Sequence, residues 1–132
     1  AVRYGQKIGV PRDQVERALA EGQDVLLRVD PQGAATIKRL IPEAVVIFIL
    51  PATMEELEER IRARGGDTEA DIQRRLVEAA REIGSLAGFD YAVVNEEGKL
   101  DQTVNRIAAI IHAEKARPGR PRPRIRSPQE LA

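Results

Sequence analysis

The residues best suited to chemistry are arginines on either side of a Gly-Gly pair. Three of them alternate along the end of one predicted helix, and two more lie in the helix that follows. They are Arg60, Arg62 and Arg64 before Gly65-Gly66, and Arg74 and Arg75 after it. Guanidinium groups bind phosphate through several planar N–H donors and stay charged at any ordinary pH. Beside a flexible hinge, this pattern predicts a lid that closes over polyphosphate.

A simpler interpretation of the same arginines is a solvated helix face that carries both charges. Glutamates are interleaved with them, and the pairs Glu56/Arg60 and Glu58/Arg62 have the i,i+4 spacing that is common on surface helices. Spacing alone favours this simpler interpretation. Both interpretations therefore stay open until other parts of the chain are considered.

Composition limits the classes of protein that need to be considered. The chain has 132 residues, of which 42% are hydrophobic and 32% charged, and we expect one globular domain. The formal net charge is zero, so no global field attracts nucleic acid or membrane. The chain has no Cys and a single His, His112, which excludes disulfides, thiolate metal sites and multi-histidine metal sites. Without a long apolar run or a signal segment, we expect a cytoplasmic protein and no protein-built metal site.

Helices are expected to alternate with strands. The expected helices cover residues 11–22, 34–40, 54–64, 68–87 and 99–116, and the expected strands cover residues 24–29, 45–50 and 91–94. Thr53 with Glu56, and Thr68 with Asp71, are capping signals for two of the helices. Alternation of this kind predicts an α/β fold with a parallel sheet, whose ligands bind at the carboxyl ends of the strands. That rule selects Asp30, Pro51 and Asn95, which each follow a strand.

The C-terminal residues 117–132 have a different character. Prolines interrupt a series of arginines, so we expect neither a helix nor a core but a flexible, basic Pro/Arg tail. Its arginines could contact the phosphates of RNA, yet it has no aromatic residue for base stacking. We therefore favour a solvated tail over a nucleic-acid site.

Several segments, in the right order, resemble the guanylate kinase family. Residues 24–34 (DVLLRVDPQGA) are similar to the family pattern D-V-x-L-x-[IV]-D-x-Q-G-A. The others are residues 47–51 (IFILP), 60–65 (RIRARG), 68–76 and 89–95 (FDYAVVN). The resemblance extends over residues 4 to 112. It implies a P-loop nucleoside monophosphate kinase-like fold, which is a parallel sheet with a helical lid, and transfer of a phosphoryl group from ATP to GMP with Mg²⁺.

The resemblance also implies roles for five residues. Arg64 and Arg75 match catalytic lid arginines that contact the phosphates, and Arg64 and Asn95 match ATP-binding positions. Asp30 and Gly9 match GMP-binding positions, and a carboxylate suits the N1–H and N2–H donors of guanine. The alternatives are that Asp30 only caps the turn before Gly33 and that Asn95 is only a turn residue. Helical geometry favours Arg75 over Arg74, because position 75 borders the apolar stripe of its helix.

Two departures from the family pattern stand out. The phosphate-binding motif G-x-x-x-x-G-K-[ST] occurs nowhere in the sequence, so we expect the C-terminal portion of a guanylate kinase with the N-terminal part absent. Ile8 and Val10 stand where many members carry Tyr and Ser/Thr hydroxyls that contact GMP. The family's strand before the phosphate loop lies between the strands expected at 24–29 and 45–50. Without it, both would have unpaired edges, which predicts an unstable, swapped or self-associating chain.

These expectations define a layout and two functions. Residues 1–22 would be a remnant of the GMP-binding region with a connecting helix, residues 23–52 and 88–116 the α/β core, and residues 53–87 the lid with its flanking helices. The first function is phosphorylation of GMP to GDP in purine nucleotide metabolism by the complete protein, with this chain alone inactive. The alternative is a non-catalytic, guanylate-kinase-like protein-binding module, which Ile8 and Val10 favour.

Overall fold

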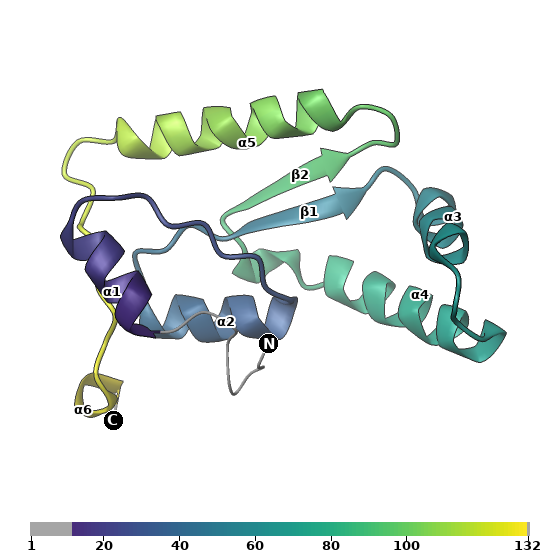
Figure 1. The fold of residues 1–132 in the computed structure, drawn as a ribbon, viewed down its shortest axis with the longest axis horizontal. Helices are drawn as coiled ribbons and strands as arrows, with labels where there is room; N and C mark the ends of the chain where they lie inside the picture. The colour runs from purple at the N-terminus through teal and green to yellow at the C-terminus, as the bar shows by residue number, and fades with distance from the viewer. Residues whose placement is uncertain (1–11, 132) are drawn as a thin grey trace. The chain divides into compact units, whose positions relative to one another are not determined.

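The computed structural model describes residues 12–131, which divide into two compact units. The first unit comprises residues 12–46 and 121–131, and the second comprises Ile47–Arg120. Figure 1 shows the ribbon coloured along the chain. No helix in residues 12–131 has the length and apolar character needed to cross a membrane.

The second unit contains the sheet. Strands β1 (Ile47–Pro51) and β2 (Tyr91–Asn95) pair in parallel, with Ile47 opposite Tyr91 and Pro51 opposite Asn95. Both strands are rich in Val, Ile and aromatic residues, which favour strands. The connection between them is long and helical, as a parallel pair requires. It runs through α3 (Met54–Arg64), α4 (Glu69–Ile83) and the short 3₁₀ helix η1 (Leu86–Gly88). The predicted parallel α/β arrangement is confirmed for these strands.

Helix α5 (Leu100–Lys115) packs against β2, as Figure 1 shows. Val93 is buried on β2 and Thr103 is buried on α5. Phe48 on β1 meets Phe89, which lies just before β2, edge to face, with ring centroids 4.9 Å apart. Tyr91 donates a 2.5 Å hydrogen bond to Glu114, which ties the start of β2 to the end of α5.

Local capping decides where α3 and α4, the two helices of the predicted lid, begin. The Thr53 hydroxyl accepts a hydrogen bond from the Glu56 N–H at 3.0 Å, and the Thr68 hydroxyl accepts one from the Asp71 N–H at 3.1 Å. Both predicted caps are confirmed. Helix α4 ends at Ile83, earlier than the predicted limit near residue 87, and a turn at residues 84–85 leads into η1.

The first unit contains α1 (Arg12–Ala20), α2 (Pro31–Leu40) and α6 (Pro128–Leu131). Gly22 follows α1 with φ of +80°, a left-handed conformation that suits glycine at a helix end. Asp30 caps α2, and Pro31 occupies its first turn, where a missing N–H costs nothing. Helix α2 therefore begins three residues earlier than predicted.

Residues 24–29 do not form the strand that we expected. They have no regular secondary structure, and Leu26 on this segment is exposed. A strand needs a neighbour that accepts and donates ladder hydrogen bonds, and within residues 12–131 the sheet consists of β1 and β2 alone. An apolar sequence was therefore insufficient for a strand without such a neighbour.

The expectation that residues 117–132 form no helix was also wrong. Ser127 and Glu130 make a reciprocal capping box: the Ser127 N–H donates to Glu130 at 2.8 Å, and the Glu130 N–H donates to the Ser127 hydroxyl at 3.4 Å. Pro128 stands at the first position of α6, where proline is favoured. The sequence Ser-Pro-Gln-Glu contains the S-x-x-E pattern of a capping box. We did not predict a helix there because the surrounding prolines argued against one.

Candidate functional site: the arginine lid and the strand ends

The hinge between α3 and α4 depends on its two glycines. Gly65 and Gly66 have φ of +75° and +86°, a region that other residues rarely adopt. The Gly65 N–H donates to the Arg62 carbonyl at 3.1 Å and ends α3. The chain then reverses into the Thr68 cap of α4. Asp67 lies between these glycines and the Thr68 cap. The turn at the glycines therefore directs Asp67 back toward both helices.

Arg64 and Arg75 converge on the carboxylate of Asp67. An amino nitrogen of Arg64 lies 3.5 Å from Oδ2, and one of Arg75 lies 3.6 Å from Oδ1. The Asp67 side chain is 15% exposed, whereas the Arg64 and Arg75 side chains are 59% and 44% exposed. The structure thus brings together the two arginines that the sequence selected. Asp67 itself was not selected, although an acidic residue directly after a Gly-Gly pair that is flanked by arginines was a usable signal.

Arg74 and Arg75, the two neighbouring arginines of α4, lie on different sides of the helix, as expected. Arg74 pairs with Asp71 one turn earlier at 3.0 Å and is the more exposed of the two. Arg75 lies on the side of the helix that carries the buried Ile72 and reaches back to Asp67 in the hinge segment. Arg75 is therefore the better placed of the two to meet a ligand together with Arg64.

Arg62 follows the simpler interpretation. It donates two hydrogen bonds of 2.9 Å to Glu69 across the hinge and one of 2.9 Å to Glu58, which confirms the predicted Glu58/Arg62 pair. The Arg62 hydrogen bonds hold the pKa of Glu69 at about 2, and a bond from Gln73 adds to this effect. Because these donors are already engaged, Arg62 links α3 to α4 and does not present an open phosphate site.

The carboxyl ends of β1 and β2 form a polar edge. The Asn95 side-chain oxygen accepts a 2.8 Å hydrogen bond from the Thr103 hydroxyl, and its main-chain oxygen accepts one of 2.7 Å from Arg60. Arg60 also pairs with Glu97 at 3.1 Å, where the sequence had suggested Glu56 as its partner. Glu56 accepts from the Glu97 N–H at 3.4 Å, and its other carboxylate oxygen is buried with no hydrogen-bond partner among residues 12–131. Asn95 therefore has a structural role, and its amide nitrogen is the group left to consider for a ligand.

Asp30 lies in the first unit and caps α2. Its Oδ1 accepts from the Gly33 N–H at 2.7 Å, as the alternative interpretation expected. A Cβ atom at Gly33 would lie 3.0 Å from Val29 Cβ and 3.2 Å from Asp30 Oδ1, so a larger residue would require these neighbours to shift by a few tenths of an ångström. Capping engages one carboxylate oxygen and is compatible with a ligand on the other. Gly9, together with Ile8 and Val10, lies outside the described residues.

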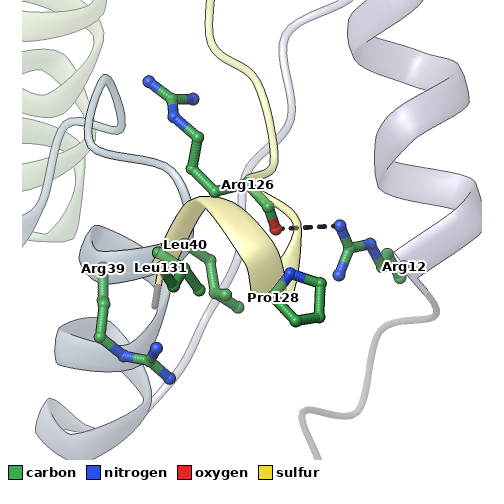
Figure 2. Close-up of a pocket in the computed structure, with 6 residues that line it drawn as sticks. All are labelled: Arg12, Arg39, Leu40, Arg126, Pro128 and Leu131. Atoms are coloured by element: carbon green, nitrogen blue, oxygen red, sulfur yellow. Dashed lines mark hydrogen bonds between the residues drawn. The ribbon is translucent and has the colours of Figure 1, made fainter.

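A hollow of about 370 Å³ in the first unit is lined by other residues. Figure 2 shows its lining, which consists of Arg12, Arg39, Leu40, Arg126, Pro128 and Leu131. Arg12 donates to the Arg126 main-chain oxygen at 3.1 Å, and Arg126 is bound to Glu43. The lining contains neither a nucleophile nor a group that transfers protons near neutral pH, and none of the predicted site residues. We do not assign a catalytic role to it.

A parallel strand pair with polar residues at its carboxyl edge, together with an arginine-bearing helical lid, defines an α/β fold of the nucleoside monophosphate kinase type. The family model described as guanylate kinase matches residues 1–114. The chain is 47% identical over 116 residues to a guanylate kinase of Thermus thermophilus, covering 88% of this chain and 52% of that protein. It is 43% identical over 117 residues to a guanylate kinase of Carboxydothermus hydrogenoformans, covering 89% and 56% respectively.

A solved structure agrees with these relatives. The crystal structure of guanylate kinase from Anaplasma phagocytophilum matches with a TM-score of 0.55 at 29% identity, over 91% of this chain and 73% of that one. The chain therefore belongs to the guanylate kinase family. It spans about half the length of the curated relatives that it matches.

Proposed function

We propose that this chain contributes the lid and the strand-end residues to an enzyme that transfers the terminal phosphoryl group of ATP to GMP. The observation that carries the proposal is the convergence of Arg64 and Arg75 beside a Gly-Gly hinge, in a member of the guanylate kinase family. Phosphoryl transfer depends mainly on positioning and on stabilising charge on the moving group. Two guanidinium groups that close together over phosphates would do both.

In this proposal each residue has one role except Arg64, which has two. Arg64 and Arg75 contact the phosphates during transfer, and Arg64 and Asn95 bind ATP. Asp30 accepts hydrogen bonds from guanine, and Gly9 belongs to the same GMP site. ATP is the phosphoryl donor, and the enzyme acts in the cytoplasm.

Magnesium would arrive with the nucleotide. Within residues 12–131 no three acidic or histidine side chains are grouped to hold a metal ion. In such enzymes Mg²⁺ is bound mainly by substrate phosphates and water. The ion would neutralise phosphate charge, while Arg64 and Arg75 supply the protein's positive charge at the same groups.

Residues 1–132 alone should not catalyse the reaction, because no lysine-bearing phosphate loop is present in this sequence. The alternative function is a non-catalytic protein-binding module of the same fold, which Ile8 and Val10 favour because neither side chain can hydrogen-bond to GMP. The two functions differ in whether the chain prefers GMP over AMP.

Isothermal titration of the purified chain with GMP and with AMP tests the proposal. We expect measurable binding of GMP, weaker binding of AMP, and loss of this preference in Asp30→Asn. Asparagine caps helices as well as aspartate does, so the variant keeps the cap of α2 and removes only the carboxylate that faces guanine. If neither nucleotide binds, the enzyme proposal fails and the binding-module alternative is favoured.

The intact mass of the protein in its native source completes this test. A mass well above 14.6 kDa would show that further sequence accompanies these residues, and phosphoryl transfer should then be measurable. A mass of 14.6 kDa combined with GMP phosphorylation would contradict the expectation that these residues alone are inactive.

A further inference from the structure

We propose that Asp67 is an internal placeholder for phosphate: its carboxylate holds Arg64 and Arg75 together until the polyphosphate of a nucleotide displaces it. The inference rests on the proposed phosphate-contacting role of the two arginines and adds a residue to it. Asp67 would be a positioning residue that acts through the arginines, without itself touching the ligand.

The contacts of Asp67 imitate those of a bound phosphate. Each carboxylate oxygen faces a different guanidinium group, Oδ1 toward Arg75 and Oδ2 toward Arg64. Two oxygens of a phosphate group could occupy the same two positions. The arginines come from different helices, so a single anion is enough to hold the two sides of the hinge together.

The contacts of Asp67 with Arg64 and Arg75 are also long, so another anion can replace the carboxylate easily. At 3.5 and 3.6 Å they exceed the length of a good N–H···O hydrogen bond, and the guanidinium groups therefore keep donors for another acceptor. The Arg62–Glu69 pair on the same hinge is different, because both of its bonds are 2.9 Å long. The lid thus has one tight pair that links the helices and one loose cluster whose anion can be replaced.

The position of Asp67 beside the glycine hinge allows its carboxylate to move away from Arg64 and Arg75. It follows Gly65 and Gly66, whose positive φ values give this segment conformations closed to other residues. A carboxylate that stayed beside a bound phosphate would repel it, so binding requires Asp67 to turn away. Asp67 should therefore compete with phosphate, and removing its charge should strengthen phosphate binding.

Inorganic tripolyphosphate is a suitable probe, titrated calorimetrically into the full 132-residue chain at low ionic strength. We expect Asp67→Asn to bind it about threefold to tenfold more tightly than the natural chain, in line with the combined strength of the two exposed ion pairs that Asp67 makes. Asp67→Ser, which also lacks the charge, should show the same gain. Adding Arg64→Ala or Arg75→Ala to Asp67→Asn should abolish the gain.

Asp71→Asn is the matched control. It makes the same change in net charge four residues later, in the first turn of α4, but it releases Arg74 and not the Arg64–Arg75 cluster. Its affinity for tripolyphosphate should stay within about twofold of the natural chain. Thermal melts of all variants establish that each one is folded before it is titrated.

Three results would overturn the inference. They are equal or weaker binding by both Asp67 variants, an equal gain in Asp71→Asn, and no binding of tripolyphosphate by any variant. The GMP titration separates this inference from the proposed function. If GMP binds selectively and Asp67→Asn gains nothing, only the placeholder fails; if the gain is present and GMP does not bind, the phosphate site remains and the guanylate kinase proposal fails.

Discussion

The lid of the second unit and the C-terminal segment of the first unit, residues 121–131, both combine arginines with carboxylates, yet they use them differently. In the lid, Arg64 and Arg75 are largely exposed and meet Asp67 at 3.5 and 3.6 Å. In the C-terminal segment, the Arg126 side chain is 19% exposed and donates hydrogen bonds to both carboxylate oxygens of Glu43. The Glu43 side chain is 14% exposed. The lid leaves guanidinium donors available to a ligand, whereas in the C-terminal segment the Arg126 donors are occupied by Glu43.

The C-terminal segment uses its arginines to cap helices. The Arg122 side chain donates to the carbonyls of Leu19 and Ala20 at 3.2 and 3.1 Å, and the Arg126 N–H donates to the Leu40 carbonyl at 2.8 Å. These acceptors lie at the ends of α1 and α2, where carbonyl groups lack partners within the helix. The same residue type therefore builds structure where its donors are satisfied and remains available to a ligand where they are not.

The largest effect on stability should come from breaking the mostly buried Arg126–Glu43 ion pair. Glu43→Ala should lower the free energy of unfolding by about 2–3 kcal/mol, because Arg126 would keep its charge in a site with little water. Urea denaturation followed by circular dichroism measures this change. Glu16→Ala is the control, since the exposed Arg12–Glu16 pair at 3.5 Å should contribute less than about 0.5 kcal/mol. Equal losses in the two variants would contradict the distinction.

The lid hinge should give the next largest effect. Gly65→Ala forces a side chain into a conformation with φ of +75° and ψ of 173°, at a cost of about 1–3 kcal/mol. Thermal unfolding measures the change. Gly88→Ala is the matched control, because Gly88 has no positive φ and its added Cβ would meet open space. A hinge that tolerates alanine as well as position 88 does would show that the glycines are not required.

Acid should weaken the C-terminal segment through Glu43. The Arg126 hydrogen bond lowers the pKa of Glu43 below its ordinary value of 4.5. Because the folded pKa is lower than the unfolded one, the stabilisation is complete above the unfolded pKa and is lost as pH falls through the folded pKa. Urea denaturation at a series of pH values from 6 downward should show this loss. Glu43→Gln should have a flatter profile, and an unchanged profile would contradict the assignment.

The smallest effect should separate Arg74 from Arg75. Neither Arg74→Ala nor Arg75→Ala should change the free energy of unfolding by more than about 0.5 kcal/mol, because both pairs are exposed. Tripolyphosphate affinity should fall in Arg75→Ala and change little in Arg74→Ala. Calorimetric titration of the two variants checks this difference, and an equal loss would mean that only net charge matters.

Self-association of the chain stays a prediction. Ile49 on β1 is exposed, and within residues 12–131 the only ladder partner of β1 is β2. An apolar strand with a free edge tends to pair with another chain. Sedimentation velocity at several concentrations should therefore show species larger than 14.6 kDa, which Ile49→Lys should diminish. A monomer at every concentration would count against the inferred sheet order.

Much of the local structure could be predicted from the sequence. The Thr53 and Thr68 caps, the helix at Met54–Arg64 and the last strand with its following helix agree with the expectations. Each depends on signals within a few residues, such as a hydroxyl three positions before its N–H donor. The phosphate-contacting roles of Arg64 and Arg75 also come from the sequence, through the order of several short motifs, and they stay a prediction.

Only the tertiary structure decided which charges meet and which apolar segment becomes a strand. Arg126 and Glu43 are 83 residues apart, and no local pattern relates them. Arg64 and Arg75 share Asp67 because the glycine hinge reverses the chain between two helices. Residues 24–29 stay irregular because strand hydrogen bonds require a neighbour that apolar composition cannot supply. Helix caps are properties of adjacent residues, whereas ion pairs and sheets depend on which distant segments are brought into contact.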